Sequence, residues 1–469
     1  LTACYDDKGS YDYHDICEVN IEGLESVYET VYRESVLEID PTVTVTEGNI
    51  GDTTRFAYEW RANVPYNSTE LIGTERILNY RVELAPRDYT LYFRVTDRQT
   101  GVVTVATSTL KVGTAYSKGI LLIGENTQGE ADVQMLSMVK DTVLYKELLK
   151  NSGLPVLKNP VDIIHTGAAG NSNYIKLWVL TGSQAYSMDR KTFAGSESDV
   201  FGKLLFMDRT FDTEFVPVDI IPRVKDKAGK NGGSSYYRTV VCNNGYIFNA
   251  STLLMGGDYY NNPVNCLTSD QNTYYKAFPY LFYTLNSYSG GFLWFDVENR
   301  RFLTVKNSIA VSDLLEDQAG DPFPWNQGTT GRTLVYGENT LDVGSSNGNS
   351  FAILKDPAGA YYLYKFRAVG SGPTKLNCYT IGAGAVDFDK ADFYAFSSRR
   401  TVVYYAVGAT LHAYDYNKGN ERHYTFDMGD PITMLYCDTA IEPNANPLYV
   451  ATYNATTGGK LQKYIQGVN

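Results

Sequence analysis

The chain has 469 residues, of which 43% are hydrophobic and 20% charged, and its formal net charge is -12 at pH 7. This composition is that of a folded globular protein, and the length requires more than one hydrophobic core unless a closed repeat architecture takes up most of the chain. With 53 acidic and 41 basic residues, the chain is an improbable partner for nucleic acid, because phosphate binding needs clustered Lys and Arg. No run approaches the ~20 apolar residues that span a bilayer.

The first residues, Leu1-Thr2-Ala3-Cys4, resemble the processing site of a bacterial lipoprotein, in which small residues precede a cysteine. We therefore expect Cys4 to carry lipid and to be the only attachment to a membrane. The segment that follows is polar and shows no periodicity, which is typical of a spacer. Residues 1–16 are predicted to be the lipoprotein N-terminus and spacer.

Residues 17–113 alternate apolar and polar side chains with a period of two, which predicts strands with one buried face. About seven short strands fit into roughly 95 residues, the size and pattern of an immunoglobulin-like β-sandwich with Trp60 in its core. The clearest strands are at 19–21, 36–39, 43–45, 56–60, 89–95 and 102–105.

Three stretches, 4–13, 58–60 and 89–97, resemble the PKD-like family of Bacteroidota surface lipoproteins. The resemblance implies a PKD-like sandwich over 17–113 and a lipid-anchored protein on the extracellular face of the outer membrane. It also implies that Asp6 and Asp7, just after the lipidated cysteine, act as a surface-export signal. Such proteins are accessory to uptake systems built from a SusC-like TonB-dependent transporter and a SusD-like lipoprotein.

Residues 114–469 repeat a strand-turn-strand pattern. The clearest copy is a three-stranded meander at 402–407, 411–416 and 422–426, and weaker copies begin near 178, 240, 292, 351 and 448. Their spacing, on the order of 45–70 residues, is that of four-stranded propeller blades with inserted loops. We predict an all-β chain in which a β-propeller of six or seven blades, with seven favoured, follows the sandwich. Two short helices are predicted within it, at 141–150 and 312–318.

The search for catalytic and metal-binding residues gives a negative expectation. Only four histidines are present, and of these His412 and His423 lie on adjacent predicted strands, where a solvated cross-strand pair is favoured over a metal site. The pattern at 344–348 matches a nucleophile elbow, but a strand follows where a helix is required. The acidic groups at 387–392 and 415–421 are explained by a blade edge and a hairpin turn. We expect no catalytic residue, metal or cofactor, and read the cysteines after Cys4 as buried small hydrophobes.

Three loops are candidate contact surfaces, at 225–235, 256–263 and 321–328. The last two place aromatic residues among turn-forming residues, which often exposes their side chains. Tyr259, Tyr260 and Trp325 are the predicted ligand- or partner-binding residues, with local packing as the alternative.

Together, the resemblance and the residue patterns favour a binding protein without enzymatic activity that captures a glycan or an oligopeptide, docks on the transporter, or does both. Two alternatives stay open at this point. One is a surface hydrolase of glycans or peptides with its active site in the propeller, and the other is a structural scaffold for the transporter complex. The sequence does not choose between glycan and peptide.

Overall fold

The computed structural model describes residues 17–139, 141–166, 176–221, 223, 237–251, 257, 259–284, 290–340, 348–442, 445–465 and 467. Cys4, Asp6 and Asp7 therefore lie outside the described residues. The prediction of an all-β chain is confirmed, because every helical segment in the described part is a short 3₁₀ helix, namely η2 (Glu197–Asp199), η3 (Phe201–Leu204) and η4 (Phe388–Lys390).

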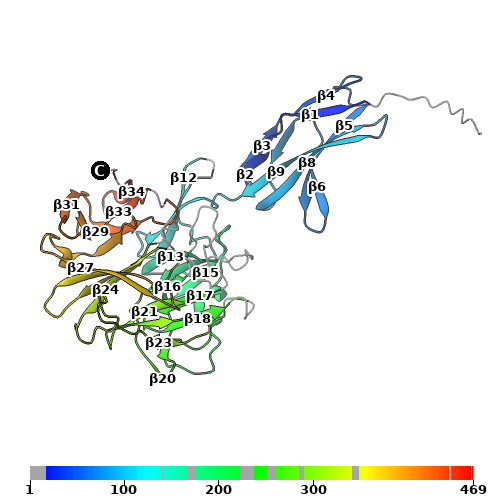
Figure 1. Cartoon of the computed structure of the whole chain (residues 1–469). Helices are drawn as coiled ribbons and strands as arrows, with labels where there is room; N and C mark the ends of the chain where they lie inside the picture. Colours follow the sequence, from blue (N-terminus) through cyan, green and yellow to red (C-terminus); the bar gives the residue numbers. More distant parts are fainter. Residues whose placement is uncertain are drawn as a thin grey trace, which may run out of the picture. The chain divides into compact units, whose positions relative to one another are not determined.

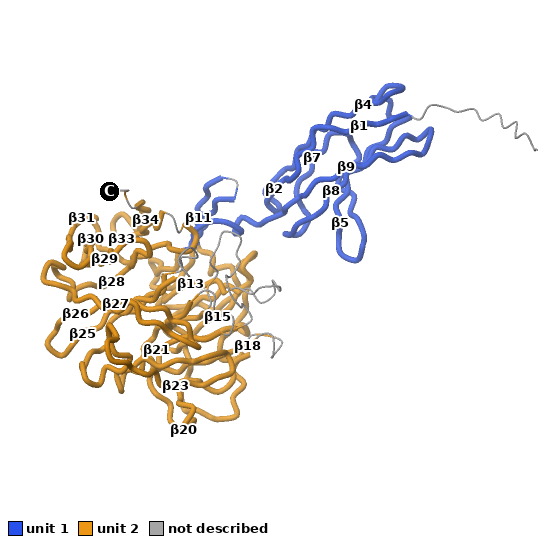
Figure 2. Tube along the Cα trace, viewed as in Figure 1, with its two compact units in different colours: residues 1–121, 134–146 blue, residues 122–133, 147–469 orange. Residues whose placement is uncertain are grey.

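The chain forms two compact units (Figure 2). Unit 1 contains residues 1–121 and 134–146, and unit 2 contains residues 122–133 and 147–469. The chain thus crosses between the units three times between residues 121 and 147. The predicted boundary at residue 113 stays a prediction, because no single crossing point separates the units.

Unit 1 before residue 114 consists of one five-stranded sheet and two two-stranded sheets. The five-stranded sheet has the order β2-β9-β8-β5-β6, and the small sheets are β1-β4 and β3-β7. The strands are β1 (Val19–Glu22), β2 (Val27–Val31), β3 (Val36–Ile39), β4 (Thr42–Val45), β5 (Phe56–Val64), β6 (Ser68–Gly73), β7 (Leu78–Arg81), β8 (Arg87–Asp97) and β9 (Val103–Gly113).

One apolar core joins these three sheets. Trp60, fully buried, is at its middle and stacks on Phe93 with ring centroids 4.3 Å apart. Its indole N–H donates to the carbonyl oxygen of Glu75 at 3.0 Å, so the only polar atom of the side chain is satisfied. The prediction that Trp60 is a core residue is confirmed.

Seven consecutive sheets, numbered here 1 to 7, follow along the described chain (Figure 1). Sheet 1 is β10 (Gly119–Glu125), β11 (Ala131–Ser137) and β12 (Val143–Tyr145), at the crossings between the units; sheet 2 is β13 (Pro160–Thr166), β14 (Lys176–Thr181) and β15 (Ala185–Met188); sheet 3 is β16 (Pro217–Ile221), β17 (Tyr237–Cys242) and β18 (Ile247–Ser251). Sheet 4 has the order β20-β19-β23-β22-β21, from β19 (Cys266–Leu267), β20 (Asp270–Tyr274), β21 (Phe292–Asp296), β22 (Arg301–Val305) and β23 (Ser312–Leu314).

The last three sheets are simple antiparallel meanders. Sheet 5 is β24 (Thr333–Asn339), β25 (Ser350–Lys355), β26 (Tyr361–Arg367) and β27 (Thr374–Ile381); sheet 6 is β28 (Phe393–Phe396), β29 (Val402–Val407), β30 (Thr410–Asp415) and β31 (Arg422–Asp427); sheet 7 is β32 (Ile432–Cys437), β33 (Leu448–Asn454) and β34 (Gly458–Tyr464). The meander predicted from 402 to 426 is confirmed in sheet 6, where β29, β30 and β31 pair in sequence.

Consecutive sheets of unit 2 pack through shared apolar cores. In one example, Phe351 of β25 stacks on Phe396 of β28 with centroids 4.6 Å apart and planes 4° from parallel. Each core draws buried residues from two neighbouring sheets: Trp178 and Phe248 between sheets 2 and 3, Val241 and Trp294 between 3 and 4, Phe295 and Phe366 between 4 and 5, Leu363 and Val403 between 5 and 6, and Leu411 and Val450 between 6 and 7. No single sheet of this series buries its own apolar faces, so each depends on its neighbours.

Both predicted helices are wrong. Residues 143–145 form β12, which pairs with β11, and 312–314 form β23, which pairs with β22. In each case the helical spacing of apolar residues is overridden by a neighbouring strand that supplies backbone partners. Of the described cysteines, Cys17, Cys242, Cys266 and Cys437 are buried, as expected, and Cys378 is half-buried; none of these five forms a disulfide with another described residue.

Candidate ligand site

The first strands of the sheets in unit 2 bring a group of charged and phenolic side chains together. This group, called here the Arg223 cluster, is formed by Asp162, Asp219, Arg223, Tyr280, Tyr283, Tyr336, Glu338 and Tyr436. Its members come from β13, from β16 and the residue two positions after it, from the segment preceding β21, from β24 and from β32. The two most distant members, Asp162 and Tyr436, are 274 positions apart in the sequence.

Arg223 is fixed by two carboxylates from different sheets. Its Nη2 lies 2.7 Å from Asp162 Oδ2 on β13 and 3.0 Å from Asp219 Oδ1 on β16. The backbone places it there, because Arg223 forms an antiparallel bridge with Thr166 at the end of β13. Register shifts after Pro160 and after Pro217 bring both aspartates to this side.

The charges of this trio depend on one another. Burial works against the charge of Arg223, but the carboxylates of Asp162 and Asp219 outweigh it and raise the pKa of the guanidinium. Burial also raises the pKa of Asp219, and the nearby Arg223 opposes that rise. We take the trio as an ion-paired group with one cation and two carboxylates, because the two short contacts to Nη2 reward ionisation of both partners.

Tyr283 and Asn339 continue the connection to the next sheets. The phenol of Tyr283 is hydrogen-bonded to the backbone of Arg223, and burial raises its pKa to about 12. The side chain of Asn339 donates to the Leu281 carbonyl at 2.8 Å and accepts from the Tyr283 backbone N–H at 3.2 Å. The backbone N–H of Asn339 donates to the Tyr280 hydroxyl at 2.7 Å. These bonds tie the segment before β21 to β24.

Glu338 makes the connection from β24 to β28. The backbone N–H of Phe396 lies 3.1 Å and 3.0 Å from its two carboxyl oxygens, and the Tyr336 hydroxyl lies 3.0 Å from Oε2. Burial raises the pKa of Glu338 to about 8. The same Tyr336 hydroxyl lies 2.9 Å from the carbonyl oxygen of Tyr394, so both contacts are hydrogen bonds at once only when Glu338 carries a proton and donates it.

Tyr436 lies on β32 of sheet 7. Burial raises the pKa of its phenol; the carboxylates of Asp438 and Glu338 add to the rise, and Arg223 opposes it.

Several members of the cluster remain accessible although protein surrounds them. The side chains of Arg223 and Asp162 keep 34% and 35% of their surface accessible, against 6% for Asp219. Tyr436 keeps 48%. These partly accessible charged and phenolic side chains are candidates for contact with a ligand.

The predicted contact residues do not belong to this cluster. Tyr260 is completely buried and packs on Phe201 at 5.2 Å, and Trp325 is 3% exposed and packs among phenylalanines. For these two residues the predicted surface role is corrected, because local packing uses both rings. Tyr259 is 37% exposed and meets Phe206 edge to face at 4.9 Å; its role in binding stays a prediction.

The 321–328 loop is fixed by side chains of the protein itself. Asp317 accepts the backbone N–H of Trp325 at 2.6 Å and that of Asn326 at 3.2 Å. Lys375 joins Asp317 and Asp321 with contacts of 2.5 Å each. The predicted contact loop at 225–235 lies outside the described residues, and so does most of the 344–348 pattern. In the predicted contact loop at 256–263, Gly256 and Asp258 also lie outside them, as does the preceding Met255.

His412 and His423 face each other, as their strand positions allow. His412 Nδ1 and His423 Nε2 are 3.0 Å apart, and the Tyr405 hydroxyl is 3.1 Å from the same Nε2. Only one ring of the pair is solvated, since His412 is 3% exposed whereas His423 is partly exposed; burial lowers the pKa of both rings. Within the described residues, no group of three or more His, Cys, Asp or Glu side chains is placed to hold a metal. The expectation of no metal stays a prediction.

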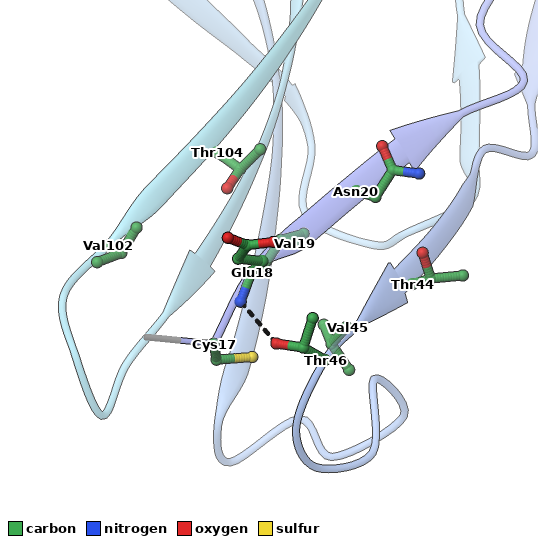
Figure 3. Close-up of a pocket in the computed structure, with 9 residues that line it drawn as sticks. All are labelled: Cys17, Glu18, Val19, Asn20, Thr44, Val45, Thr46, Val102 and Thr104. Carbon is green, nitrogen blue, oxygen red and sulfur yellow. Dashed lines mark hydrogen bonds between the residues drawn. The ribbon is translucent and has the colours of Figure 1, made fainter. Parts of the chain in front are cut away.

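A depression of about 580 Å³ lies in unit 1 (Figure 3). It is lined by Cys17, Glu18, Val19, Asn20, Thr44, Val45, Thr46, Val102 and Thr104. The backbone N–H of Glu18 donates to Thr46 Oγ1 at 2.9 Å across it. Its walls carry no aromatic ring and no cation, so it lacks the anchors that fix a ligand in a specific site.

The chain matches the PKD-like family over residues 4–160. No curated protein matches it. Similar solved structures include a quinonprotein alcohol dehydrogenase-like protein from Bacteroides thetaiotaomicron, at 12% identity over 95% of this chain and 94% of that chain with a TM-score of 0.36. A second is the β-propeller domain of Cps50 from Myceliophteria thermophila, at 10% identity over 66% of this chain and 99% of that chain, with a TM-score of 0.30. A third is the extracellular domain of a putative one-component system from B. thetaiotaomicron, at 10% identity over 93% of this chain and 65% of that chain, with a TM-score of 0.34. At these identities and TM-scores, none carries an inference about this chain.

None of the helices in the described part of the chain has the length and apolar character needed to cross a bilayer.

Proposed function

We propose that this protein is a lipid-anchored binding protein on the extracellular face of the outer membrane, accessory to a SusC-like TonB-dependent transporter and a SusD-like lipoprotein. It captures glycan or peptide cargo without catalysis. The observation that carries the binding role is the Arg223 cluster, in which a partly accessible arginine contacts aspartates of two neighbouring sheets. The match to the PKD-like family over 4–160 supports the surface role.

In this proposal, residues 17–113 are an immunoglobulin- or PKD-like sandwich and residues 114–469 are a seven-bladed β-propeller. The single core shared by the three sheets before residue 114 supports the first. The seven consecutive sheets and the apolar cores shared between neighbouring sheets support the second. The sandwich then serves as a stalk between the anchor and the propeller.

The anchor is tested on Cys4, which is expected to carry lipid. Replacing it (Cys4→Ala) should release the protein from the outer membrane into the medium or periplasm, because no other membrane attachment is proposed. Fractionation of cells producing either version, with mass spectrometry of the N-terminal peptide, measures this. An N-terminal cysteine free of acyl groups in the native protein would contradict the anchor. Replacing Asp6 and Asp7 together by asparagine should leave the lipid in place but reduce surface exposure to added protease.

A glycan hydrolase is the second candidate, because the pKa of Glu338 near 8 is suited to a general acid and two further carboxylates lie in the same cluster. The hydrogen bonds favour binding over hydrolysis, however, since the Glu338 carboxyl already accepts from the Phe396 backbone N–H and from the Tyr336 hydroxyl. Turnover of polysaccharides and oligopeptides by the purified protein separates the two functions.

A pure scaffold is the third reading. It predicts that the transporter and the SusD-like protein co-purify with this protein from native outer membranes while no soluble ligand binds. Co-purification together with cargo affinity supports the proposed function, and absence of both partners from such preparations would contradict its accessory role.

A further inference from the structure

We infer that the His412–His423 pair is an acid-sensitive contact that holds the edge strand β31 on sheet 6, and that uptake of a second proton by the two rings releases the strand. The contact is independent of the proposed cargo and of its binding site. It is built from the side chains of Tyr405, His412 and His423 and from the carbonyl group of Val386.

Strand β31 is held on sheet 6 from one side only. It is the last strand in the order β28-β29-β30-β31 and pairs with β30 from Arg422 to Asp427. Five of its six side chains are exposed, and His423 alone is partly buried. The backbone bonds to β30 and the His423 side chain are therefore the main attachments of this strand. Loss of one side-chain contact has more effect here than on a strand that lies between two neighbours.

The hydroxyl of Tyr405 fixes which of the two rings donates. Its oxygen lies 2.6 Å from the Val386 carbonyl oxygen and 3.1 Å from His423 Nε2. A carbonyl oxygen only accepts, so the single hydroxyl hydrogen goes to Val386, and the Tyr405 oxygen accepts from His423. His423 Nε2 therefore carries a hydrogen. The same Nε2 faces His412 Nδ1 at 3.0 Å, so His412 Nδ1 is an acceptor and carries no hydrogen.

The surroundings of His412 keep its ring neutral. The side chain is 3% exposed and stacks on Tyr405, with ring centroids 4.5 Å apart and planes 13° from parallel. Burial lowers the pKa of both histidines, and the neighbouring His423 lowers that of His412 further. A buried neutral imidazole that accepts a hydrogen bond is thus the folded form of this contact.

The contact tolerates one added proton but not two. His423 can take the first on Nδ1 while its Nε2–H still donates to His412, and a charged donor makes this bond stronger. The second proton must go to Nδ1 of His412, where it would place two N–H groups and two cations 3.0 Å apart. A histidine in a detached strand takes up a proton at about pH 6.5, whereas the folded pair does so at lower pH. The contact is therefore stable above about pH 6.5 and is lost as the pH falls further.

The charges around the pair reduce this effect without removing it. The carboxylate of Asp387 raises the pKa of both rings, but it is also paired with Lys390 at 2.7 Å. The phenols of Tyr394, Tyr405 and Tyr414 stay uncharged in acid, because burial raises their pKa values. Other charged side chains of the adjoining segments are Asp389, Asp415, Lys418, Glu421, Arg422 and Asp427.

Hydrogen–deuterium exchange of the full-length chain, read by mass spectrometry at about pH 7.5 and about pH 5.5, tests this contact. The measured quantity is the protection of peptides that cover β31 relative to peptides that cover β25, after correction for the intrinsic pH dependence of exchange. His412→Asn keeps an acceptor near the Nδ1 position and does not titrate. His423→Gln keeps a donor near the Nε2 position and does not titrate either. His165→Asn is the matched control, because this histidine lies on β13 and burial lowers its pKa to about 4.

The relative protection of β31 in the parent is expected to fall by about tenfold from the higher to the lower pH. His412→Asn should keep the same relative protection at both pH values, and His165→Asn should lose it as the parent does. The inference is overturned if the parent shows no acid loss, if His412→Asn loses protection as the parent does, or if His165→Asn abolishes the loss. If circular dichroism shows that His412→Asn does not fold, His423→Gln takes its place. Equal protection of that variant at both pH values supports the inference, and a loss like that of the parent overturns it.

Discussion

Glu338 shows how a single buried side chain can set the pH range of a fold. Its carboxyl joins β24 to the backbone of Phe396 on β28, and its contact with Tyr336 is complete only in the protonated form. Burial raises its pKa from 4.5 to about 8. The folded chain therefore keeps a proton that the unfolded chain releases, and the stability that Glu338 contributes is full below about pH 4.5 and lost as the pH rises to about 8.

Replacing Glu338 by glutamine should remove this loss of stability at high pH. Glutamine keeps a donor for Tyr336 and an acceptor for the Phe396 N–H but does not ionise. We expect Glu338→Gln to match the parent at about pH 5 and to exceed its free energy of unfolding by on the order of 2–4 kcal/mol at about pH 9. Urea denaturation across this range measures the difference, with the exposed Glu298→Gln as control. If the free energies of unfolding of parent and variant changed in parallel with pH, the pKa of Glu338 would be the same in the folded and unfolded chain, which would contradict this prediction.

At the residue scale, the sequence predicts packing better than it predicts the site. Trp60 is recognisable as a core residue because it stands in an alternating strand. Tyr260 and Trp325 look exposed because turn-forming residues surround them, yet both rings turn inward and complete apolar cores. Asp162, Arg223 and Glu338 carry no local signal at all, since their partners lie on other sheets, as Asp162 does for Arg223.

Gly291 and Gly370 mark the closest backbone approach between two neighbouring sheets. A methyl group on Gly370 would lie 2.3 Å from the Val305 carbonyl oxygen and 2.5 Å from Gly291 Cα. Thr304 donates to the Gly370 carbonyl at 2.6 Å at the same place. Sheets 4 and 5 can therefore approach to this distance only without a side chain at either position.

The substitution Gly370→Ala is expected to push these sheets apart and to lower the free energy of unfolding by about 1–3 kcal/mol. Gly372→Ala is the matched control, because nothing lies within 4 Å of its added methyl group, and it should be neutral. Chemical denaturation of both variants checks this. Equal stability of the two would mean that the approach at Gly370 relaxes without cost.

At the element scale, strand patterns were predictable where the turn chemistry was explicit. In sheet 6, Gly408 adopts a positive φ of 58° between β29 and β30, as the glycine in the sequence indicated. The helix predicted at 141–150 is wrong. Val143 and Leu144 lie at helical spacing from other apolar residues, but they pair with β11 as a strand. A short apolar segment does not reveal whether it forms a helix or a strand, because the partner strand is not part of the local pattern.

Separate cores predict that the two units unfold separately. Trp60 belongs to a core formed only by residues before 114, and Trp294 belongs to a core between sheets 3 and 4. Trp60→Ala and Trp294→Ala should each cost about 3–5 kcal/mol in the unit concerned. Calorimetry is expected to show two transitions, with each variant lowering the midpoint of a different one. A single transition that both variants lower equally would show that the units unfold as one.

For the whole molecule, the sequence predicted an all-β chain and the repetition of meanders, because these follow from local periodicity and spacing. It could not predict the five-stranded order of sheet 4, in which β19 pairs in parallel with β23 although three strands, β20, β21 and β22, separate them in the sequence. Pairings of that kind depend on contacts between distant segments, for which no local pattern exists.

The shared cores of unit 2 join sheets that are neighbours in the sequence, and this has a consequence for synthesis. During synthesis, the apolar face of each sheet can be covered as soon as the following sheet has left the ribosome, so little apolar surface is exposed at any time. The last apolar face to be covered is that of sheet 6, where Leu411 waits for Val450 of β33. Premature termination before β33 would therefore leave this face exposed and prone to aggregation, and quality-control proteases would be expected to remove the product.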